Sequence, residues 1–415
     1  MANAKEVIVT SDSRAETWSS AVWDPQTGSC LMVYKNAAAI GDNCLQIINN
    51  SYLIGADITK SRLHIWPLNS QSPVANLRLT TPGKISALSC TSNGAYIAAS
   101  VAEKIFIWQT STGKLLRTLG RHYQTVTCLK FSDDKSTLVS GGDDGLVYVW
   151  SLMKIINNHD QSSPVFSHSH HTLPVKDIYV GNFGAKSRLV TVSLDRTARI
   201  YETHTGRQLL VLVFDVPLTS VALDLTETNL FVGCVDGVIR QINLSSPPRG
   251  IEHHVPNEKN GGVYFKSHTN QVTNLSVSVN NQTLLSGSQD GTVNIWDIPS
   301  RQSIRTITHK GPITSAFFAP AYDNFRATNL QPNIVIRPLH RIVNEDDNDD
   351  IIEIISQKND NDLLNIDDYL EDNAGYGGNE DSANRLAEAN AEIEKLKKIN
   401  NELFKFSVKH LMADK

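Results

Sequence analysis

The sequence predicts an all-β fold: a seven-bladed β-propeller over residues 1–340, an acidic flexible linker over 341–381 and a C-terminal coiled-coil α-helix over 382–415. Three observations predict it. Short strand-like segments that end in a large side chain recur about every 42 residues, as blades of this kind do. Tight-turn dipeptides precede several of these segments. After residue 340 the composition becomes acidic, and after residue 381 the apolar residues follow a heptad spacing.

The repeat is set by seven anchor positions, which are separated by 43, 42, 42, 51, 41 and 54 residues. The two long intervals contain polar, turn-rich stretches, where insertions into a repeat belong. The anchors are Trp23, Trp66, Trp108, Trp150, Tyr201, Ile242 and Trp296. The spacing therefore predicts one four-stranded sheet for each anchor.

Within a repeat, the pattern indicates antiparallel hairpins. Leu146–Trp150 and Thr292–Trp296 have the alternation and β-branched content of strands. An Asp-Gly turn precedes each of them, at Asp144-Gly145 and Asp290-Gly291. Strands this short, joined by tight turns at even spacing, are typical of sheets stacked around a ring.

Both ends of the predicted propeller contribute to one blade. Up to the first anchor, Trp23, there is room for only two strands, at Val7–Val9 and Ser19–Trp23. Two more candidates, Ile313–Phe318 and Asn333–Arg337, follow the last anchor. Together they would complete one four-stranded sheet and close the ring, which removes exposed sheet edges.

Three repeats carry the same four polar or aromatic positions. The first two sets have identical spacings of 18, 4 and 6 residues, and the third has 20, 4 and 6. They are His122, Ser140, Asp144 and Trp150; His268, Ser286, Asp290 and Trp296; and His171, Thr191, Asp195 and Tyr201. This pattern resembles the WD-repeat (WD40) family, in which these residues form a hydrogen-bonded network within each blade.

A catalytic Ser/His/Asp triad is the competing interpretation of these residues. A hydrolase needs one such set, whereas three sets follow the phase of the repeat, which favours the structural role. The other blades lack the full set: Ala98 and Ala102 precede Trp108, and Val232 takes the hydroxyl position before Ile242. We expect no catalytic residue and no enzymatic activity.

Histidine clusters at His168–His171 and His253-His254 raise the possibility of a metal site. Neither has cysteine or carboxylate partners at ligand spacing, so surface histidines are favoured. The five cysteines are scattered without a C-x-x-C pair, as in proteins of reducing compartments. No phosphate-binding loop, signal peptide or run of 18 apolar residues occurs. We therefore expect an intracellular protein without metal, cofactor or membrane span.

The tail differs in charge from the rest. Residues 344–372 contain 12 acidic residues and one basic residue, Lys358, a net charge of −11. The whole chain has a net charge of −5, so the remainder carries +6. A mildly basic body is compatible with surroundings rich in nucleic acid, although no dense Lys/Arg run marks a binding face.

The last segment predicts a dimerisation helix. Its apolar positions, with one asparagine, follow the a and d positions of a heptad. The predicted dimer interface consists of Leu386, Ile393, Leu396, Asn400 and Leu403. An Asn at an a position sets register and favours two strands. Docking of this helix on its own propeller is the alternative to a parallel homodimer.

Several segments narrow the resemblance to one family. They include His171–Asp177, Phe214–Leu225, Gly287–Val293 and Leu396–Ser407. In these the chain resembles the WD repeat-containing protein 18 family, whose fungal members belong to a complex that processes internal transcribed spacer RNA. The similarity extends over essentially the whole chain and is weakest at residues 340–380.

Membership implies a nuclear scaffold, in the nucleolus and nucleoplasm, for assembly of the large (60S) ribosomal subunit. The resemblance also implies a homodimer that holds a large helical-repeat subunit and joins pre-60S particles. A giant AAA-type ATPase docks on these particles, where RNA contact becomes possible. Because propellers host many roles, two other classes remain open: a substrate adaptor of another complex, such as a ubiquitin ligase, and a coat subunit.

Overall fold

The computed structural model describes residues 6–75, 77–157, 163–245, 250–256, 262–330, 332, 334–341, 395–398 and 402. The chain divides into two units, Met1–Asn348 and Asp349–Lys415. In the second unit, residues 395–398 are helical. Most of the predicted linker and coiled-coil helix therefore lies outside the described residues. In the described part of the chain, no helix is long and apolar enough to cross a membrane.

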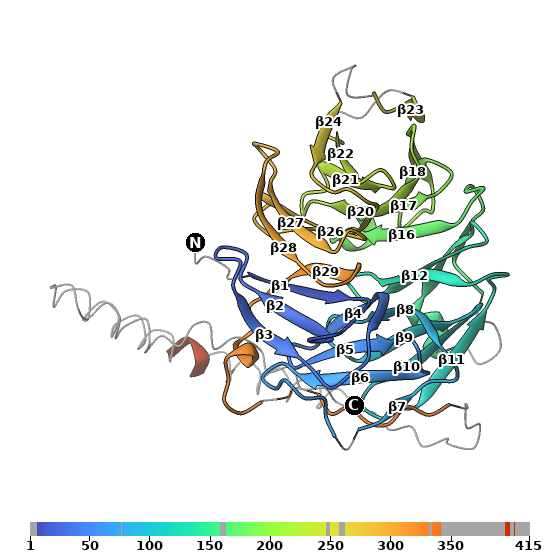
Figure 1. The fold of residues 1–415 in the computed structure, drawn as a ribbon. Helices are drawn as coiled ribbons and strands as arrows, with labels where there is room; N and C mark the ends of the chain where they lie inside the picture. Colours follow the sequence, from blue (N-terminus) through green and yellow to red (C-terminus); the bar gives the residue numbers. More distant parts are fainter. Residues whose placement is uncertain are drawn as a thin grey trace, which may run out of the picture. The chain divides into compact units, whose positions relative to one another are not determined.

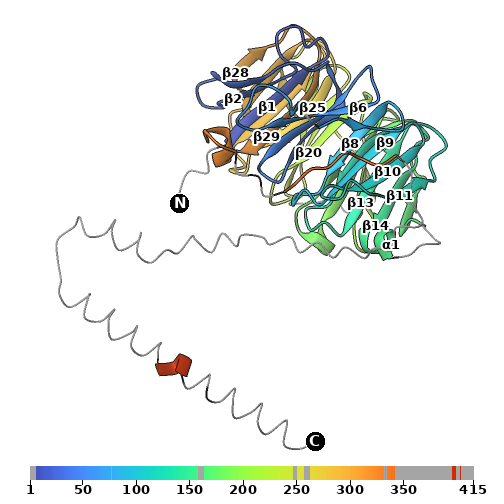
Figure 2. The ribbon, with the colours of Figure 1, turned by 90° about the horizontal axis from the view of Figure 1, so that it is seen from below.

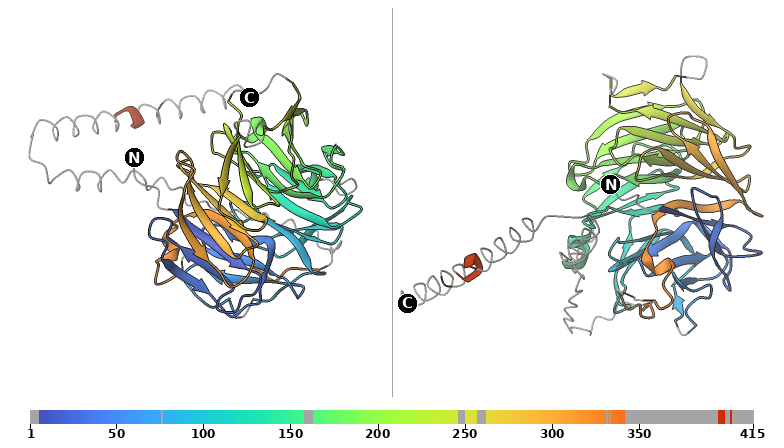
Figure 3. Two further views of the ribbon diagram at one scale, coloured as in Figure 1. Left: turned by 45° about the horizontal axis from the view of Figure 1, so that its top comes forward. Right: turned by 90° about the vertical axis from the view of Figure 1, so that its left-hand side faces the viewer.

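In the described part of the first unit, the strands form seven sheets, which we number as blades 1 to 7 (Figures 1 and 3). The strands of the first four blades, from the inside outward, are as follows. Blade 1 contains β29 (Ile313–Pro320), β1 (Glu6–Asp12), β2 (Ser20–Trp23) and β3 (Cys30–Tyr34). Blade 2 contains β4 (Ile40–Ile48), β5 (Tyr52–Asp57), β6 (Arg62–Pro67) and β7 (Leu79–Thr80). Blade 3 contains β8 (Ile85–Cys90), β9 (Tyr96–Val101), β10 (Lys104–Gln109) and β11 (Leu115–Gly120). Blade 4 contains β12 (Val126–Phe131), β13 (Thr137–Gly142), β14 (Val147–Ser151) and β15 (Phe166–His168).

The last three blades repeat this order. Blade 5 contains β16 (Val175–Val180), β17 (Arg188–Ser193), β18 (Thr197–Glu202), β19 (Gln208–Val213) and the added β23 (Glu252–His254). Blade 6 contains β20 (Leu218–Leu223), β21 (Asn229–Cys234), β22 (Val238–Asn243) and β24 (Val263–Lys266). Blade 7 contains β25 (Val272–Val277), β26 (Thr283–Ser288), β27 (Thr292–Asp297) and β28 (Ser303–Thr308). Helix α1 (Leu152–Asn157) follows β14, and 3-10 turns lie at Gly184–Lys186 and Asp323–Phe325.

The innermost strands contact one another in a closed circuit, in the order β29, β4, β8, β12, β16, β20 and β25, and back to β29. This ring confirms the predicted seven-bladed propeller. Each anchor of the sequence repeat lies on the third strand of its blade. There the side chain packs between adjacent sheets: Trp66, Trp108 and Trp150 are almost completely buried. Tyr201 and Trp296 are buried as well, whereas Trp23 and Ile242 are partly buried. Burial of these large side chains explains why the period is so regular.

The two long intervals of the repeat are insertions at the outer side of the propeller. The first contains α1, before β15. The second lies between β22 and β24, and its strand β23 pairs in parallel with β19 of the neighbouring blade (Figure 1). This insertion therefore ties blade 6 to blade 5.

Both ends of the first unit contribute strands to the blade that closes the ring, as predicted. The number of strands from each end differs from the predicted two and two. Strand β29 pairs antiparallel with β1, with Val7 opposite Ala319, and β2 and β3 complete the sheet. Three strands therefore come from the N-terminal side and one from the C-terminal side. The prediction that residues 333–337 form a second C-terminal strand of this blade is wrong.

Residues 334–341 instead form a segment that we call the strap. It lies against blades 2 and 3, on the side where the first and second strands of each blade are joined (Figures 1 and 2, orange). The N–H groups of Arg337 and His340 donate to the carbonyl oxygens of Thr110 and Gly113, at 3.3 and 2.8 Å. Ile334 and Leu339 are buried in the same core cluster as the inner residues of blades 2 and 3. Since β3 already fills the outer place in blade 1, this segment has no sheet edge to join there.

Candidate interaction surface

The structure brings together the three predicted polar sets, one each in blades 4, 5 and 7. In blade 4, His122 Nδ1 lies 3.0 Å from Asp144 Oδ2 and His122 Nε2 lies 2.9 Å from Ser140 Oγ. The indole N–H of Trp150 donates to the same Ser140 Oγ at 3.0 Å. Because an indole can only donate, Ser140 accepts from Trp150 and donates its own proton to His122. The aspartate then accepts the N–H of the imidazole.

The other two sets repeat this geometry. In blade 7, His268 lies 3.1 Å from Asp290 and 2.7 Å from Ser286, to which Trp296 donates at 2.8 Å. In blade 5 the corresponding distances are 2.9 Å from His171 to Asp195 and 2.8 Å from His171 to Thr191. There the Tyr201 hydroxyl lies 3.1 Å from His170 Nδ1.

These contacts match those of a catalytic triad in order, but the hydroxyl groups are inaccessible. Ser140, Thr191 and Ser286 are each 0% exposed. In blades 4 and 7 the indole N–H also occupies a lone pair of the serine oxygen. A nucleophile needs access to its substrate, so the geometry assigns these side chains to the framework of the blades.

Burial sets the charge states of the networks. It lowers the pKa of His122 and of His268 below the ordinary value, although the neighbouring aspartates oppose this shift. Burial alone would raise the pKa of Asp195, but hydrogen bonds from His171 and Thr197 outweigh it and hold that pKa well below its usual range. The imidazoles of His122 and His268 are therefore neutral near neutral pH, and the carboxylate of Asp195 is ionised.

Blade 1 contains a related cluster that the sequence reasoning missed. Trp23 donates to Thr10 Oγ1 at 2.8 Å, and His309 Nδ1 lies 3.6 Å from Asp12 Oδ2. Trp18 and Trp23 both pack edge-on against the His309 ring. The signal was present, since His309 precedes the inner strand β29 as His122 precedes β12. It is split between the two ends of the propeller, which hides the spacing.

Neighbouring blades are joined by a second repeated feature. The inner strands carry a bulge near their first residues, and in five of them a Ser or Thr lies at this bulge. In blade 1 this residue is Thr314, whose hydroxyl group lies 2.8 Å from that of Ser11 in the same sheet. In each of the other four blades, the residue at the bulge contacts the next blade. Its hydroxyl donates to the first carbonyl oxygen of the next inner strand, at 2.5 to 3.0 Å. The donors are Ser86, Thr127, Thr219 and Thr273, and the acceptors are Val126, Val175, Val272 and Ile313. Blade 5 has Lys176 at this place, and the Lys176 ammonium instead lies 3.4 Å from Asp143.

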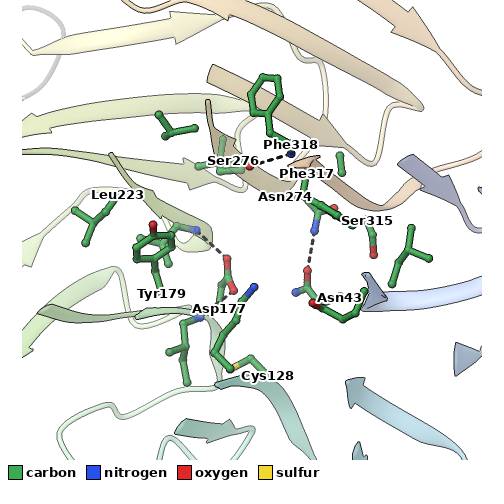
Figure 4. A pocket seen from close by; sticks show the side chains of 18 of the residues that line it. Asn43, Cys128, Asp177, Tyr179, Leu223, Asn274, Ser276, Ser315, Phe317 and Phe318 are labelled. Carbon is green, nitrogen blue, oxygen red and sulfur yellow. Dashed lines mark hydrogen bonds between the residues drawn. The ribbon is translucent and has the colours of Figure 1, made fainter. Parts of the chain in front are cut away.

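The inner strands surround a cavity of about 290 Å³ (Figure 4). Asn274 Nδ2 donates to Asn43 Oδ1 at 2.7 Å, which joins β25 to the bulged start of β4. The carboxylate of Asp177 accepts the backbone N–H groups of Val221 and Ile178 at 3.0 and 2.9 Å. Burial raises the pKa of Asp177 to about 6, despite these bonds and the charge of Lys130. Polar groups in this cavity are thus used mainly to connect inner strands.

The prediction that the clustered histidines lie at the surface is wrong for His168 and His171, which are buried, whereas His254 is exposed. His168 stacks on Tyr201 with ring centroids 4.2 Å apart, and His253 and His254 lie on β23. Among the described residues, no group of three or more His, Cys, Asp or Glu side chains is placed to hold a metal ion.

The predicted dimer interface is described at one position. Leu396 lies in the helical residues 395–398 and is 60% exposed. Leu386, Ile393, Asn400 and Leu403 lie outside the described residues. The homodimer therefore stays a prediction.

Comparison with known proteins agrees with this architecture. The family model described as "WD domain, G-beta repeat" matches residues 113–151 and 262–297, which include most of blades 4 and 7. The chain is 35% identical to human WD repeat-containing protein 18 over 429 residues, 99% of each chain. It is 34% identical to the zebrafish (Danio rerio) protein of the same name over 424 residues, 98% of each chain. It is also 30% identical to pre-rRNA-processing protein IPI3 of Yarrowia lipolytica over 298 residues, 68% of this chain and 69% of the relative. With similarity of this extent to proteins of one name, and with the propeller that the sequence predicts, the chain belongs to the WD repeat-containing protein 18 family.

Proposed function

We propose that this chain is a non-catalytic scaffold subunit of a nuclear pre-60S ribosome assembly complex. It acts in processing of the internal spacer of pre-rRNA and in maturation of the large subunit. The observation that carries the proposal is the similarity over 98–99% of the chain to WD repeat-containing protein 18. Two more distant relatives, from Yarrowia lipolytica and Caenorhabditis briggsae, are named as pre-rRNA-processing proteins.

The polar side chains described above support a scaffold role, because they hold the propeller together. The three buried triad-like sets stabilise blades, and the bulge hydroxyl groups join them. A ring held in this way presents loops in fixed positions, which suits a protein that places partners rather than one that transforms a substrate.

The proposal includes the partners and the location. The chain binds a large helical-repeat subunit and, through the assembled complex, the pre-60S particle and a giant AAA-type ATPase. It works in the nucleolus and nucleoplasm and meets RNA on the particle.

Affinity purification of the tagged chain tests this role. We expect large-subunit precursors to co-purify and depletion of the chain to increase the amount of pre-rRNA that retains its internal spacer. Recovery of ubiquitin-ligase subunits without ribosomal precursors would contradict the proposal and favour the adaptor role. Normal spacer processing after depletion would contradict it as well.

The C-terminal helix supplies two-fold stoichiometry in this proposal. Changing Leu396→Asp and Leu403→Asp places charges at two d positions and should give a monomer with a folded propeller. Light scattering measures the mass, and circular dichroism the fold. A matched control, Lys395→Asp with Lys398→Asp, places the same side chains at outer heptad positions and should leave the dimer intact. If the mass of the wild-type chain is that of a monomer, the dimer proposal is wrong.

A further inference from the structure

Blade 6 is an apolar version of the polar blades. Phe214, Val232, Asp236 and Ile242 have the same spacings of 18, 4 and 6 residues as the polar sets of blades 4 and 7. Phenylalanine thus replaces histidine, valine replaces the hydroxyl residue and isoleucine replaces tryptophan. Phe214, Val232 and Ile242 lie in one hydrophobic cluster.

A guanidinium group lies within this apolar blade. Arg240 on β22 is opposite Val232 in the register of β21 and β22, and it is 6% exposed. Its guanidinium carbon lies 5.7 Å from the ring centre of Phe214 and 5.4 Å from that of Tyr264. Nε and Nη1 of Arg240 are buried and have no hydrogen-bond partner.

In the three blades that carry polar sets, the residue at this register position has a polar partner. In blade 4, the Tyr148 hydroxyl donates to Arg121 O at 3.2 Å. In blade 7, Asn294 accepts from the Thr306 hydroxyl at 2.6 Å. In blade 5, Arg199 Nη1 donates to Gln208 Oε1 at 3.3 Å. Arg199 Nε is also buried without a partner, so Arg240 differs from Arg199 in lacking an acceptor at Nη1 and in having aromatic contacts instead.

Burial of a cation without acceptors is costly, and ring contacts return only part of the lost hydration. An anion that reached the unpaired nitrogens would remove this cost. A guanidinium presents a planar fork of N–H groups that matches a carboxylate group.

Arg240 lines a cavity of about 160 Å³. It is bounded on one side by β22 and the start of β24, and on the other by the insertion that carries β23. The Tyr264 hydroxyl donates to Pro256 O at 2.8 Å and so fixes the insertion over the blade. Gln241, Asn243 and His253 also line the cavity.

We propose that this cavity binds a carboxylate side chain of an acidic polypeptide partner, with Arg240 as its recognition residue. One buried cation beside a small cavity matches a single carboxylate, whereas a nucleic-acid backbone is bound by several cations along a groove. The inference goes beyond the proposed role in ribosome assembly and does not depend on it.

The probe for the test is a fluorescently labelled peptide of alternating Gly and Glu residues, compared with the same peptide carrying Gln in place of Glu. We expect the full-length chain to bind the Glu peptide and to bind the Gln peptide about tenfold or more weakly, as the loss of a charge-assisted hydrogen bond predicts. Arg240→Met should weaken binding of the Glu peptide by a similar factor. Arg199→Met, the matched control in blade 5, should leave it unchanged.

Thermal unfolding shows whether Arg240 serves to bind a ligand or only to stabilise the fold. Without peptide, Arg240→Met should unfold at the wild-type temperature or above, because it removes an unpaired buried charge. If Arg240→Met does not fold, Arg240→Lys keeps the charge without the planar fork and should still weaken binding. Equal binding of the Glu peptide by wild type and the folded Arg240 variant would overturn the proposal. So would a single-stranded RNA whose binding requires Arg240 while the Glu peptide does not bind.

Discussion

Blades 3 and 4 are neighbours that bury the same residue in different ways. Trp150 of blade 4 donates its indole N–H to Ser140, ten residues away in the same sheet. Trp108 of blade 3 donates to the carbonyl oxygen of His340, 232 residues away in the strap, at 2.8 Å. A buried N–H needs an acceptor in either case. Blade 4 contains its own acceptor, whereas blade 3 depends on a segment that follows all the other blades.

The register explains the difference. Ser140 lies opposite Tyr148 in blade 4, and the equivalent residue of blade 3 is Ala99, opposite Phe106. The turn between β9 and β10 is shorter, so the residue ten positions before Trp108 is not the structural counterpart of Ser140. Because Ala99 has no hydroxyl group at the position that Ser140 occupies in blade 4, the Trp108 N–H is available to the strap.

Three changes test this difference between blades 3 and 4, and removal of the strap should lower the stability of the propeller the most. A chain that ends at residue 330 loses the burial of Ile334 and Leu339, about 1.5–3 kcal/mol each, and leaves the Trp108 N–H unpaired for about 1–3 kcal/mol. Release of the ordered strap residues offsets part of this, so we expect a net loss of about 3–6 kcal/mol. Denaturant unfolding measures it. A chain that ends at Arg341 keeps the strap and serves as the control. Equal stability of the two chains would show that blade 3 does not need the strap.

Ser140→Ala should lower the free energy of unfolding by less than removal of the strap does. Its direct effect should be confined to blade 4. The change leaves both His122 Nε2 and the Trp150 N–H without a partner, at a cost of about 2–4 kcal/mol. Chemical denaturation gives the change in the free energy of unfolding. A double-mutant cycle with Trp150→Phe should be less than additive, because Phe has no N–H to leave unpaired. Full additivity would mean that the serine and the tryptophan do not interact.

Acid should destabilise blade 4 more than blade 3. Of the three changes, we expect this one to have the smallest effect on stability. Because the pKa of His122 is lowered in the fold, unfolding takes up a proton below the ordinary histidine pKa of about 6.5. The contribution of His122 to stability is complete above that pH and falls as the pH decreases toward the lowered pKa. Amide exchange, corrected for intrinsic rates, should show a greater loss of protection in β13 and β14 than in β9 and β10 between pH 7.5 and 5.5. His122→Phe, which copies blade 6, should remove the difference. An equal loss in both blades would contradict the assignment.

The sequence predicts what is local. The anchors and the polar sets of blades 4, 5 and 7 follow from spacings within one repeat, and the structure places these residues in contact. The role of the bulge hydroxyl groups was also readable, because an apolar residue followed by Ser or Thr recurs at Ile85-Ser86, Val126-Thr127, Leu218-Thr219 and Val272-Thr273.

What the sequence did not predict depends on partners that are far apart in the chain. Nothing in the spacing around Trp108 points to His340 as the acceptor of its N–H. The strap begins with a run of β-branched residues that is typical of a strand, Ile334–Ile336, but the outer place in blade 1 is taken by β3. The unpaired guanidinium of Arg240 likewise depends on the packing of two aromatic rings, Phe214 and Tyr264, that lie 50 residues apart in the chain.

The pairing of β29 with β1 has a consequence for synthesis of the protein. A nascent chain that has been synthesised up to blade 6 is still an open arc. The edge of β1 is unpaired and the face of blade 2 is uncovered, because β29 and the strap have not yet been synthesised. Contacts between such distant residues form slowly, and exposed edges invite wrong pairing in the meantime. Closure, the His309 cluster and the strap all arrive with the final part of the propeller sequence. The residues after 341 therefore emerge only once everything needed for a complete ring has been translated.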